Sequence, residues 1–159
     1  MKRAWLLALA VLAVSFALVG GGPLGEVRVG APAETGTETA TVTFVDESGA
    51  ELGQISGPVA DTRSTRYTGL SETDSLGPNE GMIFVYDAEA TRSFVMRNMS
   101  FPLDIIFVGA DRRITAIHHA AVDDDEAFTG RARWVIEVNR GFTDDHDITE
   151  GDEVQGLPR

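Results

Sequence analysis

The chain has no cysteine among its 159 residues. Disulfide bonds, thiolate zinc sites, thiol nucleophiles and a lipid-modified N-terminal cysteine are therefore excluded. The folded part must be held together by packing alone, and hydrophobic residues, at 43% of the chain, are numerous enough to form a core. The length allows one folded unit of about 115 to 120 residues once a leader and a linker are subtracted.

Lysine is almost as scarce as cysteine. Lys2 is the only lysine, and the other twelve basic residues are arginines, against 25 aspartates and glutamates. The formal net charge of −12 and the pI near 4.5 argue against nucleic acid as a partner, because displacing its counterions requires a basic surface. An acidic surface poor in lysine is typical of a halophilic protein, since salt screens the repulsion between carboxylates. An ordinary acidic domain is the alternative.

The N-terminus has the pattern of an export signal. Lys2 and Arg3 precede an apolar run over residues 4–19, which is followed by glycines. The run is slightly shorter than the roughly 20 residues of a spanning helix, and no small-x-small cleavage site follows it at the usual distance. We expect residues 1–25 to be a signal peptide or, by a small margin, a retained membrane anchor. The domain would then be secreted or membrane-anchored and face outside the cytoplasm.

Residues 26–40 are rich in Gly, Ala, Thr, Glu and Pro and predict a flexible linker. From residue 41 to 159 the pattern changes to short runs of period two, separated by Gly, Asp, Asn and Pro, which indicates a β domain. The candidate strands are residues 41–46, 51–60, 82–86, 92–99, 103–108, 114–119, 133–138 and a short one near 153–154. The first two form a hairpin around Ser48-Gly49. This pattern predicts a mainly β, antiparallel, jelly-roll-like sandwich or barrel of about eight strands.

One short helix is expected between Asp61 and Gly69, outside the leader. Asp61 or Thr62 is a suitable N-cap, and Gly69 is a suitable stop. We expect this to be the only regular helix of the domain.

The stretch 93–108 reads as two strands joined by a tight turn at 100–102. Asp104 is a carboxylate in an otherwise apolar strand, so an inward-pointing side chain would need a partner. Arg66, Arg97 and the backbone amides of the turn are the candidates. An Arg–Asp pair at this place favours a structural clamp over a catalytic unit.

Several motifs occur together in a fixed order. They are 60–62 (ADT), 66–70 (RYTGL), 81–85 (GMIFV), 94–98 (FVMRN), 102–107 (PLDIIF), 134–138 (WVIEV) and 141–142 (GF). In this combination the chain resembles the family called domain of unknown function 192, over roughly residues 52–155. The resemblance implies a compact, mostly β domain of jelly-roll type, frequently exported or membrane-anchored, with no established biochemical activity.

The chain departs from the family's usual pattern at four positions. Ser71 stands where the family usually has Met, Val95 where it has Trp, Arg97 where it has Lys, and Met99 where it has Thr. The missing aromatic and lysine argue against a stacking platform or an amine nucleophile at this place. A cation is retained at Arg97.

No metal or cofactor is expected from the remaining candidates. Neighbouring residues of a strand point to opposite faces, so His118 and His119 cannot chelate one ion together. The acidic runs 123–126 and 144–147 lack the alternating ligands, central Gly and terminal Glu of a calcium loop and are interpreted as solvated loops.

Two functional hypotheses follow. The first is a non-catalytic binding or interaction module of the cell envelope, which recognises an unknown ligand or an envelope protein. The alternative is an enzyme acting on an envelope or extracellular substrate, with Arg66, Arg97, Asn98 and Asp104 lining one polar pocket. Met96 completes the set of ligand-binding candidates.

Overall fold

The computed structural model describes residues 38–159. The expected leader and nearly all of the expected linker lie outside this range. Between residues 38 and 159, no helix combines the length and the apolar character that crossing a membrane requires.

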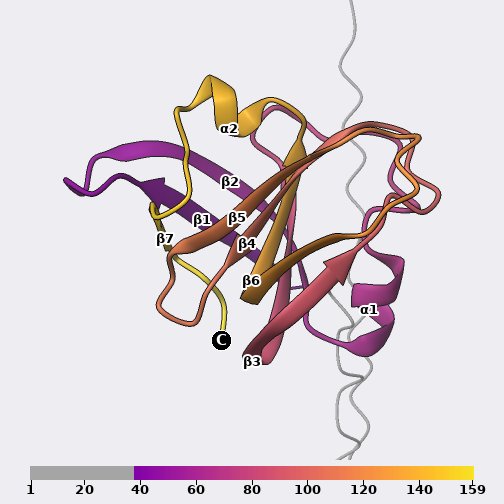
Figure 1. Cartoon of the computed structure of the whole chain (residues 1–159), viewed down its shortest axis with the longest axis horizontal. Coiled ribbons are helices and arrows are strands. Elements are labelled where there is room, and N and C mark those ends of the chain that lie inside the picture. The colour runs from indigo at the N-terminus through magenta and orange to yellow at the C-terminus, as the bar shows by residue number, and fades with distance from the viewer. Residues whose placement is uncertain (1–37) are drawn as a thin grey trace, which may run out of the picture. The chain divides into compact units, whose positions relative to one another are not determined.

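The described chain contains seven strands and two short helices (Figure 1). In chain order they are β1 (Thr39–Val45), β2 (Glu51–Ala60), α1 (Arg63–Thr68), β3 (Gly81–Phe94), β4 (Leu103–Val108), β5 (Ile114–Ala120), β6 (Phe128–Asn139), α2 (Phe142–Asp145) and β7 (Glu153–Gln155). The mainly β class is therefore confirmed, and the count of eight strands is corrected to seven.

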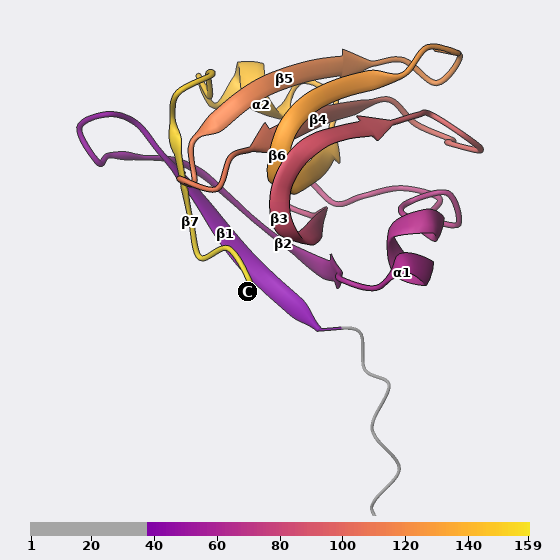
Figure 2. The ribbon, with the colours of Figure 1, turned by 60° about the horizontal axis from the view of Figure 1, so that its bottom comes forward.

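The strands form one sheet in the order β5-β4-β6-β3-β2-β1-β7, and the sheet is strongly curled (Figure 2). Each pair of neighbours is antiparallel except β2 and β3, which run parallel with Val59 opposite Ile83 and Ala60 opposite Phe84. The expectation of a purely antiparallel arrangement is wrong at this pair. The chain makes the parallel connection through α1 and the long loop that follows it.

The expected strands 82–86 and 92–99 are largely one strand. β3 shifts register between Val85 and Ala90 but keeps β6 as its partner as far as Phe94, opposite Phe128. The expected pairing of 92–99 with 103–108 does not occur, because β4 pairs with β5 and β6. Residues 95–102 instead form a loop that leaves the sheet.

Two predictions based on local sequence are confirmed. β1 and β2 form a hairpin, in which the Asp46 carboxylate accepts hydrogen bonds from the backbone amides of Ser48 and Ala50. Helix α1 begins after Thr62, whose hydroxyl accepts from the Thr65 amide while the Thr65 hydroxyl accepts from the Thr62 amide. This reciprocal cap satisfies two amides that the helix itself leaves free.

The core has two layers, one on each face of the sheet. Successive side chains of a strand point to opposite faces of the sheet. In β4, Ile106 and Val108 therefore belong to one layer, and Leu103, Ile105 and Phe107 belong to the other. The second layer also includes Leu70, Phe84 and Met96, which come from β3 and from the segments beside it. The pocket described next opens on this second face.

Candidate functional site

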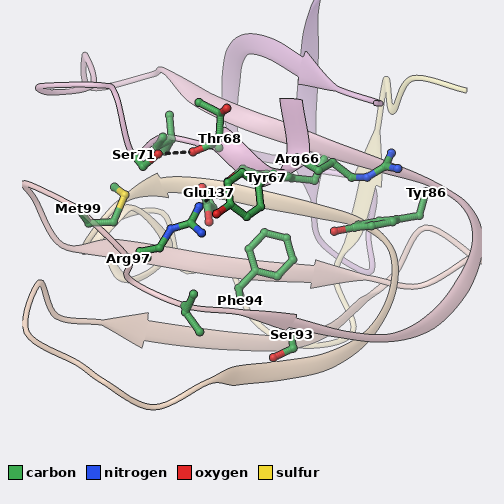
Figure 3. A pocket seen from close by; sticks show the side chains of 14 residues that line it. Arg66, Tyr67, Thr68, Ser71, Tyr86, Ser93, Phe94, Arg97, Met99 and Glu137 are labelled. Atoms are coloured by element: carbon green, nitrogen blue, oxygen red, sulfur yellow. Dashed lines mark hydrogen bonds between the residues drawn. The ribbon is translucent and has the colours of Figure 1, made fainter. Parts of the chain in front are cut away.

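A pocket of about 220 Å³ lies between the end of α1, strand β3 and the loop that follows β3 (Figure 3). Its lining is mixed in character, with two guanidinium groups, one carboxyl group, several hydroxyl groups and aromatic rings. The lining residues are Arg66, Tyr67, Thr68, Gly69, Leu70, Ser71, Phe84, Tyr86, Ser93, Phe94, Val95, Arg97, Met99 and Glu137. Small-molecule sites also combine apolar walls with polar groups, but they usually enclose about 300 to 1,000 Å³, so this pocket is smaller and more polar than most.

Arg66 fastens the last turn of α1 to the sheet. Its Nη1 donates to the carbonyl of Asp61 at 2.6 Å and to that of Val85 at 2.8 Å. The guanidinium also lies 4.9 Å from the centre of the Tyr86 ring, and the Arg92 guanidinium lies 3.8 Å from the same ring. These cation–π contacts and hydrogen bonds hold one cationic wall of the pocket in place.

Arg97 closes the pocket from the loop side. Its Nη2 donates to the Tyr67 carbonyl at 2.7 Å, and its guanidinium lies 4.1 Å from the centre of the Tyr67 ring. Among residues 38–159, the Nε and Nη1 of Arg97 have no hydrogen-bond partner. Arg97 is therefore oriented by the protein and retains donors for a ligand.

Glu137 is the least expected member of the lining. Glu137 lies on β6 and is only 7% exposed. No hydrogen bond joins its carboxyl group to any other residue of the described chain, and the residue lines the pocket. Burial raises the pKa of the Glu137 carboxyl to about 8. The group is mostly protonated at neutral pH and offers a hydroxyl donor as well as an acceptor to whatever fills the pocket.

Sequence reasoning treated Glu137 only as part of the 134–138 motif. The available signal was the same one that drew attention to Asp104, a carboxylate in an apolar strand run.

Two of the side chains that line the pocket are exposed and largely apolar. Among the described residues, the large hydrophobic side chains that stand out as exposed are Tyr67 at 71%, Val95 at 55% and Val122 at 41%, and the first two line this pocket. Exposed apolar groups gathered at one place mark ligand or partner surfaces more often than chance.

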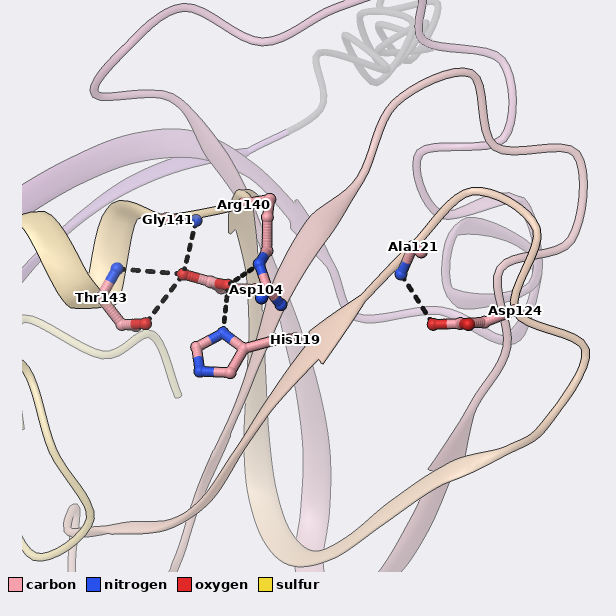
Figure 4. Close-up of polar contacts among 7 residues, drawn as sticks. All are labelled: Asp104, His119, Ala121, Asp124, Arg140, Gly141 and Thr143. Atoms are coloured by element: carbon pink, nitrogen blue, oxygen red, sulfur yellow. Dashed lines mark hydrogen bonds and ion pairs between the residues drawn. The ribbon is translucent and has the colours of Figure 1, made fainter.

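Asp104 lies elsewhere. It is completely buried, and its Oδ2 accepts from the amide of Thr143 at 3.0 Å, the Thr143 hydroxyl at 2.8 Å and the amide of Gly141 at 3.1 Å (Figure 4). Its Oδ1 lies 2.7 Å from Nδ1 of His119 and 3.8 Å from Nε of Arg140. Asp104 thus joins β4 to β5 and to the start of α2.

The expected partners of Asp104 are therefore wrong. Arg66 and Arg97 line the pocket, and the amides of the turn 100–102 do not bind the carboxylate. The reason is the pairing of β4 with β6, which directs Asp104 to the face of the sheet that carries Ile106, away from the pocket.

Helix α2 was also not expected. It occupies Phe142–Asp145 and so includes the first part of the acidic run 144–147, which was interpreted as a solvated loop. Gly141, with a φ of 93°, begins the turn and allows its own amide and that of Thr143 to point at Asp104.

Met96 and Asn98 do not line the pocket. Met96 is buried in the core layer beneath it, and Asn98 is exposed with a φ of 56°, as expected for a residue that turns a loop. Of the five candidates from the sequence, the structure brings only Arg66 and Arg97 together around one cavity.

The two histidines of β5 lie in different surroundings, as predicted. His118 Nε2 is 2.9 Å from the Thr129 carbonyl and its ring packs against Phe107, whereas His119 contacts Asp104 on the other side of the strand. Within residues 38–159 no group of three or more His, Asp or Glu side chains is placed to hold a metal ion.

Comparison with known proteins identifies a family whose model matches most of the chain. The family model for domain of unknown function 192, described as "Uncharacterized ACR", matches residues 44–156, which confirms the resemblance seen in the sequence. A search of curated proteins found no match.

Two crystal structures are similar to this chain. A protein of unknown function from Novosphingobium aromaticivorans is 34% identical, with a TM-score of 0.70 over 85% of this chain and 99% of the other. A protein from Sinorhizobium meliloti, provisionally named a transcription regulator, is 25% identical, with a TM-score of 0.72 over 77% of this chain and 97% of the other.

Proposed function

The chain belongs to the family of domain of unknown function 192, and we propose that it is a non-catalytic binding module whose pocket beside α1 takes a small ligand. The family has no assigned activity, so the proposal rests on the geometry of the pocket. We also propose that the N-terminal segment anchors the module in a membrane and holds it outside the cytoplasm. The apolar run after Lys2 and Arg3 supports that second part.

The observation that carries the ligand-binding proposal is the Glu137 carboxyl. The Glu137 residue is buried and its carboxyl has no hydrogen-bond partner in the described chain, but its oxygens are open to the pocket, since among residues 38–159 the buried side-chain atom left without a partner is Nε of Arg133. A ligand that enters the pocket can therefore hydrogen-bond this carboxyl in place of water.

The geometry favours binding over catalysis. The enzyme alternative requires Arg66, Arg97, Asn98 and Asp104 to converge, and Asp104 is sealed on the opposite face of the sheet. The Ser71 hydroxyl, which lines the pocket, donates to the Thr68 carbonyl at 2.6 Å. No histidine lies beside it among the lining residues to act as a base.

The proposal is tested by soaking crystals of the protein with a broad set of small fragments. We expect fragments to gather in the pocket beside Glu137. Ser71→Met, which places a longer apolar side chain in the lining, is expected to displace them, whereas the control Ser64→Met on the exposed side of α1 is expected to leave them in place. Fragments that avoid the pocket in all three proteins would contradict the proposal.

A further inference from the structure

We infer that the ligand is a small carboxylate carried on a flat, apolar body, and that its carboxylate is bound between the Arg97 guanidinium and the Glu137 carboxyl. This inference rests on the proposed function, since it assigns a chemical class to the ligand of the same pocket.

The distribution of charge is the first argument. The whole chain carries a net charge of −12, yet the pocket is lined by Arg66 and Arg97 against the single carboxyl of Glu137, and Arg92 lies close by on the Tyr86 ring. A cationic pocket on an acidic protein attracts anions locally while the rest of the surface repels them. A cationic ligand would instead meet two guanidinium groups.

The available hydrogen-bonding atoms are the second argument. A guanidinium binds the two oxygens of a carboxylate through Nη2 together with either Nε or Nη1, and each of these two forks uses a different hydrogen of Nη2. The bond from Nη2 of Arg97 to the Tyr67 carbonyl therefore leaves one fork free for a carboxylate. Glu137, when protonated, donates its hydroxyl to the same anion, as a carboxylic acid does to a carboxylate. This arrangement satisfies the one lining carboxyl that has no partner in the described chain.

Size and shape are the third argument. A volume of about 220 Å³ corresponds to roughly seven water molecules at about 30 Å³ each, so the ligand is small. The rings of Phe84 and Phe94 meet edge to face at 4.9 Å in the floor, and Tyr67 flanks the mouth. Aromatic walls of this kind favour a flat apolar body.

Proton linkage makes the inference testable by pH. The charged and titratable side chains around Glu137 are Arg66 and Tyr67 from α1, Tyr86 from β3 and Arg97 from the loop. Burial raises the pKa of Tyr86 above its usual value of 10, so its phenol remains neutral while Glu137 ionises. Above a pH of about 8 the Glu137 carboxylate repels an anionic ligand, and affinity falls by roughly tenfold per pH unit.

The test uses the full-length chain and three probes of one shape: benzoate, benzamide and benzylamine. Calorimetric titration is carried out in the lowest salt in which the chain remains folded, and NMR shifts locate the bound probe. At pH 6.5 we expect benzoate to bind at least about tenfold more tightly than benzamide, the usual advantage of a charge-assisted pair, and benzylamine to show no binding.

Matched variants identify the groups involved. Arg97→Gln is expected to weaken benzoate binding at least about tenfold, while Arg63→Gln, which removes the same charge from the exposed start of α1, changes it little. Glu137→Gln retains a donor but cannot ionise, so it is expected to bind benzoate without the decline above pH 8. Circular dichroism monitors folding, and if Arg97→Gln unfolds, the pH profile of Glu137→Gln decides the question.

The outcomes separate the two proposals. If benzamide or benzylamine occupies the pocket and benzoate does not, the ligand class is wrong and the binding function stands. If benzoate binds with the same pH profile in Glu137→Gln as in the wild type, the role of Glu137 is wrong. If no probe and no fragment enters the pocket, both proposals fail.

Discussion

Asp104 and Glu137 are two buried carboxyl groups on neighbouring strands of one sheet. Glu137 of β6 lies opposite Ile105 of β4, so it is one position out of register with Asp104, and the two side chains point to opposite faces. Asp104 accepts three hydrogen bonds from Gly141 and Thr143 and contacts the His119 ring. Glu137 has no hydrogen-bond partner in the described chain and lines a pocket.

This difference separates structure from function. A buried carboxylate whose oxygens are fully satisfied by its own chain is explained by folding, because it joins three segments of the molecule. A carboxyl that no group of the described chain binds and that opens on a pocket is instead available to a ligand or to water. The comparison therefore directs the search for function to Glu137, although the sequence draws more attention to Asp104.

The largest expected effect is that of Asp104→Ala. It removes the acceptor of the part-buried Gly141 amide and leaves the amide and hydroxyl of Thr143 buried without a partner, so we expect a loss of about 3 to 5 kcal/mol in the free energy of unfolding. Denaturant titration measures the change. The control Asp123→Ala alters an exposed carboxylate and is expected to shift stability by less than about 0.5 kcal/mol. A similar small loss for Asp104→Ala would overturn its role as a clamp.

The second prediction concerns the pH dependence of stability at Glu137. Between the unfolded pKa of 4.5 and the folded pKa of about 8, the folded protein holds a proton that the unfolded chain has released. The contribution of this group to the free energy of unfolding is fully present below the unfolded pKa. It decreases as the pH rises from the unfolded pKa to the folded pKa. Wild-type protein should lose about 2.5 kcal/mol relative to Glu137→Gln between pH 5 and pH 7.

Denaturant titrations of wild type and Glu137→Gln at several pH values test this prediction. Parallel curves for the two proteins would mean that Glu137 is ionised and paired in the folded state. In that case the contrast with Asp104 would disappear.

The third prediction is smaller and refines the account of Asp104. Thr143→Val keeps the shape of the side chain but removes the hydroxyl that donates to Asp104 at 2.8 Å. We expect a loss of about 2 kcal/mol, typical of a hydrogen bond to a charged group. A double-mutant cycle with Asp104→Ala should show that the two losses are not additive, because both changes remove the same interaction.

The smallest expected effect on stability is that of Arg97→Gln. Its bond to the Tyr67 carbonyl is solvent-exposed, so the cost should be below about 1 kcal/mol. Arg131→Gln, which removes an exposed ion pair to Glu89, should cost a similar amount. A much larger loss for Arg97→Gln in a thermal or denaturant titration would assign Arg97 to folding, as Asp104 is, and weaken its role in binding.

Features encoded by neighbouring residues were the ones that sequence reasoning predicted well. The cap at Thr62, the stop at Gly69 and the hairpin at Ser48-Gly49 depend on side chains within a few positions of each other. Features that depend on distant pairing were predicted poorly. Residues 82–86 and 92–94 belong to one strand, β3, because both segments pair with β6, which lies some 45 residues further along the chain.

The candidate site follows the same division. Arg66 and Arg97 were predicted together and meet at the pocket, whereas Asp104 was assigned to them wrongly and Glu137 was missed. The wrong assignment of Asp104 and the omission of Glu137 have the same cause. The sequence does not show on which face of the sheet the side chain of a strand residue lies. A shift of one residue in register reverses that face, and the sequence of a single strand does not contain the register.

The sequence by itself determined the family, the mainly β class, the caps of α1 and the need of Asp104 for a partner, because these follow from motifs, local hydrogen bonding and the cost of burying a charge. Only the tertiary structure decided which groups satisfy Asp104, that Glu137 faces a pocket, and that α1 and the loop after β3 close around it. The physical reason is that the hydrogen-bond partners of a buried polar group come from segments far away in the chain. The pairing of the whole sheet decides whether these segments lie close enough to bind the group.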